Sequence, residues 1–125
     1  MIYLDTHVLI WLYAGKLKRL SPLAHRHLDR GDRLLISPMV LLELEFLHEL
    51  GKLRKPATLV FEYLNRTIGL KQCDHPFTAV IEQAKSHKWT REPFDRIIVA
   101  QASITHSPLL TADEIIHAHY KKAIW

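Results

Sequence analysis

Short apolar runs alternate along the whole chain with longer segments whose apolar residues recur at helical spacing. A short apolar run that ends at a polar residue predicts a buried strand. A Ser-Pro or Lys-Pro start, or a glycine at the end, predicts a helix. Strands are therefore expected at residues 1–4, 34–36, 69–72, 108–111 and 123–125. Helices are expected at residues 7–14, with Thr6 as the cap, and at 22–30, 38–50, 56–66, 77–87, 93–104 and 114–120.

This alternation predicts an α/β fold. Short, fully apolar strands are typical of a parallel sheet that is covered by helices on both faces. We therefore expect a short-stranded, mainly parallel sheet sandwiched between helices. A chain of 125 residues is long enough for one core but not for two, and no repeat or linker interrupts it. Residues 1–125 are expected to form a single domain.

The helix at residues 93–104 organises the predicted fold. Pro93 suits the first helical position, and Asp95 then falls in the first turn, where its charge meets the positive end of the helix dipole. Apolar residues cover several sides of this helix, including Ile98 and Val99 on the face of Asp95. Asp95 is therefore expected to look into the molecule, where a carboxylate requires a cation or several donors.

Three further acids fall where this pattern brings them toward one edge of the sheet. Asp5 and Asp113 follow two predicted strands, and ligands of such sheets bind beyond the carboxyl ends of the strands. Glu43 interrupts the apolar stripe of its helix and therefore requires a partner. Structural interpretations stay open for each acid: Asp5 and Asp113 can cap helices, Asp95 can favour its helix dipole, and Glu43 can pair with an Arg or Lys.

Taken together, the four acids indicate a metal site. Like charges in one pocket raise the pKa values of some carboxylates and destabilise the fold unless a cation compensates them. Oxygen-only ligands suit Mg²⁺ or Mn²⁺. Such an ion can lower the pKa of a bound water and neutralise charge on a phosphate. The predicted metal-binding and catalytic residues are Asp5, Glu43, Asp95 and Asp113.

The composition of the chain bears on the charge of its expected partner and on its expected cellular compartment. The chain has 17 basic and 13 acidic residues, and with four acids sequestered in a site the remainder is 17 against 9, or +8. This balance favours a polyanionic partner, although an ordinary basic surface explains it equally well. The single cysteine, and the absence of a long apolar run or a basic start, lead us to expect a cytoplasmic protein with no membrane segment.

Several stretches of the chain carry a family resemblance. The most specific is EPFDRIIVAQA, which contains Asp95. The others are MIYLDTHVLIWLYAG with Asp5, LLISPMVLLELEFL with Glu43, LLTADEII with Asp113, and HYKKAIW. Together they cover nearly the whole chain and resemble the PIN-domain ribonucleases, specifically the VapC-type toxins of toxin–antitoxin pairs.

This resemblance implies an endoribonuclease that uses one or two Mg²⁺ or Mn²⁺ ions held by Asp5, Glu43, Asp95 and Asp113. It also implies a homodimer and inhibition by a cognate antitoxin protein that occludes the site. The expected partners are therefore an RNA substrate, an antitoxin and a second copy of the chain.

The same resemblance also suggests which residues support the four acids. Thr111 matches a small hydroxyl residue near the metal, and Thr6 and Arg96 are further candidates for supporting roles. For Arg96, a structural ion pair, for instance with Glu43, is favoured over a role in the site. The chain departs from the family at Glu92, where Asp is common; because Glu is the poorer helix cap, a looser first turn is expected there.

Other functions fit parts of the pattern. A receiver-like phosphoacceptor domain shares the size and an acidic Mg²⁺ pocket, but it requires paired acids after the first strand, where Asp5 stands alone. A catalytically silent PIN-fold module that binds RNA or protein is also compatible with the sequence. The nine histidines lack the convergent spacing of a zinc site. For Trp11, Trp89 and Trp125, core packing or a dimer contact is favoured over base stacking.

Overall fold

One sheet of five parallel strands forms the centre of the computed structural model, which describes residues 1–125. The strands are β1 (Ile2–Leu4), β2 (Leu34–Ile36), β3 (Lys71–Gln72), β4 (Leu109–Leu110) and β5 (Ala123–Ile124). They follow the order β3-β2-β1-β4-β5, and each neighbouring pair is parallel. In register, Tyr3 of the central strand pairs with Leu35 on one side and Leu109 on the other.

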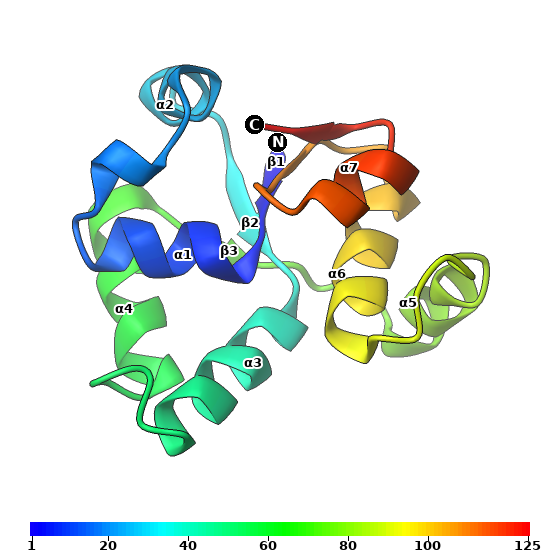
Figure 1. Cartoon of the computed structure of the whole chain (residues 1–125), viewed down its shortest axis with the longest axis horizontal. Helices are drawn as coiled ribbons and strands as arrows, with labels where there is room; N and C mark the ends of the chain where they lie inside the picture. The colour runs from blue at the N-terminus through cyan, green and yellow to red at the C-terminus, as the bar shows by residue number, and fades with distance from the viewer.

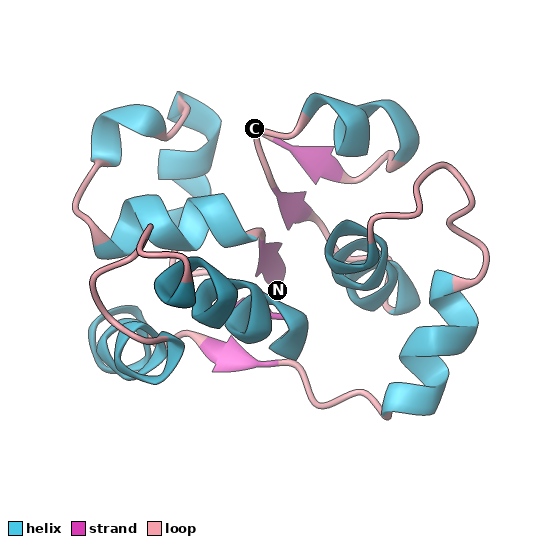
Figure 2. Cartoon of the chain, turned by 60° about the horizontal axis from the view of Figure 1, so that its bottom comes forward, coloured by secondary structure: helices cyan, strands magenta, loops and turns pink.

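Helices cover both faces of this sheet. They are α1 (Thr6–Tyr13), α2 (Pro22–Asp29), α3 (Pro38–Glu49), α4 (Ala57–Ile68), α5 (Phe77–Ala84), α6 (Pro93–Ile104) and α7 (Glu114–His119), with a 3₁₀ turn η1 (Leu17–Arg19) after α1. The chain steps from β1 to β3 in one direction and returns to β4 and β5 in the other. Because parallel crossovers are right-handed, the helices of the two halves lie on opposite faces (Figures 1 and 2).

The core consists of the strand side chains and the inward faces of the helices. Ile2, Leu4 and Leu110 are almost completely buried, and α6 is buried on nearly all sides from Ile98 to Ser103. α3 begins directly after β2 and contacts both α4 and α6, so it joins the two groups of helices. None of the helices has the length and apolar character that crossing a membrane demands.

Every predicted strand and helix is present, and the differences lie at their ends. β3, β4 and β5 are each two residues long, shorter than expected, and η1 was not predicted. α5 ends at Ala84 rather than at residue 87. The reason for this end is Arg96, whose guanidinium donates to the carbonyls of Ala84 and Lys85 at 2.8 and 3.3 Å and so satisfies the orphan groups of the last turn.

Candidate functional site

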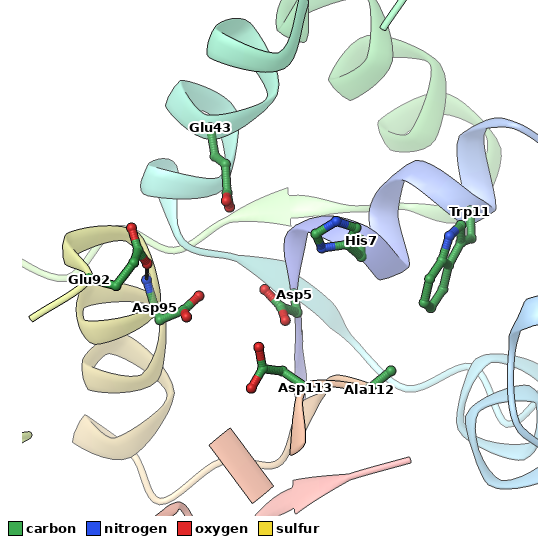
Figure 3. A pocket seen from close by; sticks show the side chains of 8 residues that line it. All are labelled: Asp5, His7, Trp11, Glu43, Glu92, Asp95, Ala112 and Asp113. Atoms are coloured by element: carbon green, nitrogen blue, oxygen red, sulfur yellow. Dashed lines mark hydrogen bonds between the residues drawn. The ribbon is translucent and has the colours of Figure 1, made fainter. Parts of the chain in front are cut away.

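A cleft of about 520 Å³ opens at the carboxyl edge of the sheet. Its walls come from β1, α1, α3, the start of α6 and the segment after β4 (Figure 3). The lining residues are Asp5, His7, Trp11, Glu43, Glu92, Asp95, Ala112 and Asp113. All four predicted acids therefore share one cleft, in which the carboxylates of Asp5, Asp95 and Asp113 point toward one another.

Asp5 is the most deeply placed carboxylate. It directly follows β1 and caps α1, with its Oδ1 accepting from the backbone N–H of Thr6 at 2.8 Å. Its Oδ2 accepts from the hydroxyl of Thr111 at 2.6 Å. Burial raises the pKa of Asp5, and these two hydrogen bonds act in the opposite direction. The capping role and a place in the cleft thus coexist in one side chain.

Glu43 reaches the cleft from the middle of α3. The hydroxyl of Thr6 donates a short hydrogen bond to its Oε1. The prediction that Thr6 caps α1 is therefore wrong: Asp5 is the cap, which leaves the Thr6 hydroxyl free for Glu43. Burial raises the pKa of Glu43, and Asp5 and Glu92 raise it further by charge repulsion. The alternative that Glu43 forms a salt bridge with Arg or Lys is contradicted, because no ion pair of the structure includes it.

Asp95 and Glu92 form the wall contributed by α6. Glu92 caps this helix through the backbone N–H groups of Phe94 and Asp95, at 3.2 and 2.6 Å. The expected loosening of the first turn is wrong, because the longer Glu side chain still reaches both donors. Burial, and then repulsion by Glu92 and the other three acids, raises the pKa of Asp95 to about 7.

Asp113 completes the set from the loop after β4. Its side chain caps α7 by accepting from the backbone N–H of Ile116 at 2.9 Å. Its own N–H donates to the hydroxyl oxygen of Thr111 at 3.1 Å. Because the same hydroxyl donates to Asp5, Thr111 ties together the two acids at the ends of neighbouring strands.

The cleft has no fixed cation to balance five carboxylates. No Lys or Arg lines it, and His7 is its one basic residue. The ion pairs of the structure lie elsewhere: His27–Asp32, Arg30–Asp32 and Lys85–Glu82. No three His, Cys, Asp or Glu side chains stand close enough to hold one ion directly between them.

The comparison with known families decides what kind of domain carries this cleft. The family model described as "PIN domain" matches residues 2–122. The chain belongs to the PIN-domain family. No curated protein sequence matches it at a significant level.

Two solved structures are similar to this PIN domain over nearly its full length. The first, a toxin–antitoxin complex from Klebsiella pneumoniae, gives a TM-score of 0.70 at 16% identity and covers 100% of this chain and 97% of that one. The second is VapBC2 from Rickettsia felis bound to a DNA fragment from its promoter, with a TM-score of 0.65 at 16% identity, covering 99% of this chain and 96% of the other. At these identities the likeness supports the fold alone.

Arg96 does not support the cleft of this PIN domain in the way the sequence suggested. Its guanidinium donates to three backbone carbonyls, those of Ala84, Lys85 and Thr90. The expected ion pair is therefore wrong. Arg96 instead fastens the loop between α5 and α6, because that loop leaves several carbonyls without a helical partner.

Sequence reasoning missed Glu92, His7 and Trp11 as lining residues of the cleft. Glu92 was treated only as a helix cap, yet it lies three residues before Asp95 and so faces the same side of the helix. His7 and Trp11 are four residues apart on the helix that Asp5 caps, which is the signal that could have placed both at the cleft.

Replacing Thr111 by Val tests the link between Asp5 and Asp113. The substitution keeps the shape of this fully buried side chain but removes the hydroxyl that contacts both acids. We expect the free energy of unfolding to fall by about 1–3 kcal/mol, because a hydrogen bond to a buried charged group is lost. Chemical denaturation at neutral pH measures this. The same change at exposed Thr67 is expected to cost less than about 0.5 kcal/mol, and equal losses at both positions would contradict the link.

Proposed function

We propose that this PIN domain is a Mg²⁺- or Mn²⁺-dependent endoribonuclease that acts as a VapC-type toxin and is inhibited by a cognate antitoxin. The observation that carries the proposal is the cleft itself, in which five carboxylates from distant parts of the chain meet without a Lys or Arg. Such an arrangement destabilises the fold unless a cation binds. The toxin–antitoxin complexes among its structural neighbours support an antitoxin as partner.

The donor set fits a hard divalent cation. All the candidate ligands are carboxylate oxygens, which suit Mg²⁺ or Mn²⁺ rather than a softer metal. Since no three of them converge on one point, we assign direct binding to part of the set and contacts through the waters of the ion to the rest, as Mg²⁺ prefers. When bound, the ion would supply charge neutralisation at a phosphate and a lowered pKa for a water. The residues that would hold it are Asp5, Glu43, Asp95 and Asp113.

The protein prepares this site by fixing its carboxylates before any ligand arrives. Asp5 is held by the Thr6 backbone N–H and the Thr111 hydroxyl, and Glu43 by the Thr6 hydroxyl. Asp95 is the exception, because its side chain accepts no hydrogen bond and its pKa lies near 7. The acids thus differ in their tasks: Asp5 and Glu43 are rigid, whereas Asp95 is free to adjust to the ligand.

Incubation with total RNA tests the proposed activity. Purified protein is incubated with Mg²⁺ or Mn²⁺, with and without a chelator, and the cut ends are mapped. We expect internal cleavage that falls at least about 100-fold when the metal is removed, since loss of the ion takes away the charge that a phosphate requires. Cleavage that persists unchanged in chelator would contradict the metal requirement, and no cleavage in either condition would favour a silent binding module.

A further inference from the structure

The side chains of His7 and Trp11 line the carboxylate cleft but make no hydrogen bond within the fold. They are four residues apart on one face of α1, with ring centroids 6.2 Å apart. His7 is exposed and Trp11 is half-buried. Because no buried side-chain nitrogen or oxygen lacks a partner, the unpaired indole N–H of half-buried Trp11 reaches solvent. Both side chains come from α1 and line the cleft (Figure 3). Two ring systems at the candidate site are thus available to a ligand.

Trp89 is a tryptophan whose ring and indole N–H both have partners within the fold. Its ring stacks on His119 at 5.0 Å with an interplanar angle of 6°. Its indole N–H donates to Nδ1 of His87 at 3.3 Å. Trp11, Trp89 and Trp125 all pack against the hydrophobic core, in agreement with the packing role that the sequence favoured. Trp11 differs from Trp89 because its indole N–H has no partner in the fold and its side chain also lines the cleft.

A positive charge lies over one side of this wall. The guanidinium of Arg19 is placed over the ring of Trp11, 5.9 Å from its centroid. The ring of Trp125 packs against that of Trp11, with 5.6 Å between the ring centroids. Lys16 and Lys18, close to Arg19 in sequence, are exposed. An aromatic platform next to cations is the combination with which proteins bind single-stranded nucleic acid, because bases stack on the ring and phosphates meet the charge.

We propose that His7 and Trp11 form the base-binding wall of the cleft: an unpaired nucleobase of RNA replaces the Arg19 guanidinium over the Trp11 ring, and Arg19 then contacts a neighbouring phosphate. The assignment of RNA rests on the proposed function. Without a bound ion, the acids that line the rest of the cleft repel phosphate, so this wall supplies affinity for RNA that the carboxylates alone cannot. A base inside a duplex has both faces covered by its neighbours. Stacking on Trp11 therefore requires an unpaired base at this position.

Substitution of Trp11 tests this wall. In Trp11→Ala we expect the KM for a single-stranded RNA oligonucleotide to rise about tenfold, since stacking of one base is lost. The kcat at saturating RNA stays within about twofold, because the carboxylates are untouched. Trp11→Phe recovers most of the affinity. An abasic nucleotide at the position that stacks raises the KM of the wild type but not that of Trp11→Ala. Tyr63→Ala, which removes a partly exposed aromatic ring on α4 away from the cleft, leaves all these values unchanged.

Binding is measured in parallel by fluorescence anisotropy of a labelled single-stranded RNA in chelator, which requires no cleavage. A dissociation constant about tenfold weaker in Trp11→Ala supports the wall even if the wild type cuts no RNA, in which case the ribonuclease proposal alone fails. Equal KM and dissociation constants in wild type and Trp11→Ala overturn the wall and leave the ribonuclease proposal standing. A variant that binds RNA normally but loses binding of an inhibitor protein also overturns it, because the ring then serves a protein interface.

Discussion

Replacing Asp95 by Asn should reduce RNA cleavage at least about 100-fold while the protein stays folded. The amide keeps the shape of the side chain but cannot supply the negative charge that a hard cation requires. Even outer ligands of metal sites typically change affinity or activity by about 10–100-fold when altered. The fold should tolerate the change, because the carboxylate of Asp95 accepts no hydrogen bond and the capping bond to Glu92 comes from its backbone.

The same substitution should make the metal-free protein more stable. The pKa of Asp95 rises from its ordinary value of 3.8 to about 7 on folding, so the charged form is disfavoured in the native state. Asn is never charged, so Asp95→Asn avoids this cost. The gain in free energy of unfolding over the wild type is small near pH 4, grows as the pH rises and is complete above about pH 7. Because Asp95 is partly exposed and screened by solvent, we expect about 1 kcal/mol rather than the full shift.

Cleavage rates and denaturation curves at pH 5 and pH 8 check both halves of this prediction. Glu62→Gln, an isosteric change of an exposed acid on α4, should alter neither activity nor stability beyond about 0.5 kcal/mol. Loss of activity together with loss of structure in Asp95→Asn would mean that Asp95 serves the fold. Cleavage at the wild-type rate by both Asp95→Asn and Asp5→Asn would dismiss the carboxylate mechanism.

Local chemistry made most of the fold predictable. α6 begins at Pro93 and carries apolar residues on most sides, so its position and burial follow from proline geometry and periodicity. The same reasoning placed Asp5 and Asp113 at the ends of two strands, which the sheet order makes neighbours. Where local preferences and tertiary packing favour the same structure, the sequence alone predicts the position of a helix, a strand or a side chain.

The side chains whose roles the sequence did not reveal depend on contacts between distant segments. Thr6 is an equally good cap in isolation, but the structure gives that role to Asp5 and the Thr6 hydroxyl to Glu43, 37 residues away. Arg96 is charged and suggested an ion pair, yet its guanidinium satisfies loop carbonyls whose direction depends on where α5 ends. The direction of such a side chain depends on which partner the fold brings near. The spacing of residues along a helix does not predict that partner.

Divalent metal should reverse the effect of pH on the stability of this protein. Burial and mutual repulsion raise the pKa values of Asp5, Glu43 and Asp95 on folding. A raised carboxyl pKa means that the native state holds protons that the unfolded chain has released. These three groups therefore make the metal-free protein less stable as the pH rises above about 4. For Asp95 this loss continues up to about pH 7. A metal ion binds the deprotonated carboxylates, so its stabilising effect grows over the same range.

The expected result is a thermal midpoint that Mn²⁺ raises strongly at pH 7.5 and little at pH 5. At a free concentration 100 times its dissociation constant the ion contributes about 2.7 kcal/mol, or on the order of 10 °C for a domain of this size. His87 has a lowered pKa through burial and therefore opposes the carboxylates, since its stabilising effect is lost as the pH falls. Comparing curves with and without Mn²⁺ at each pH removes this contribution, because His87 lies outside the cleft. In the double variant Asp5→Asn, Asp95→Asn the shift should vanish at every pH, and a shift that survives there would place the metal elsewhere on the molecule.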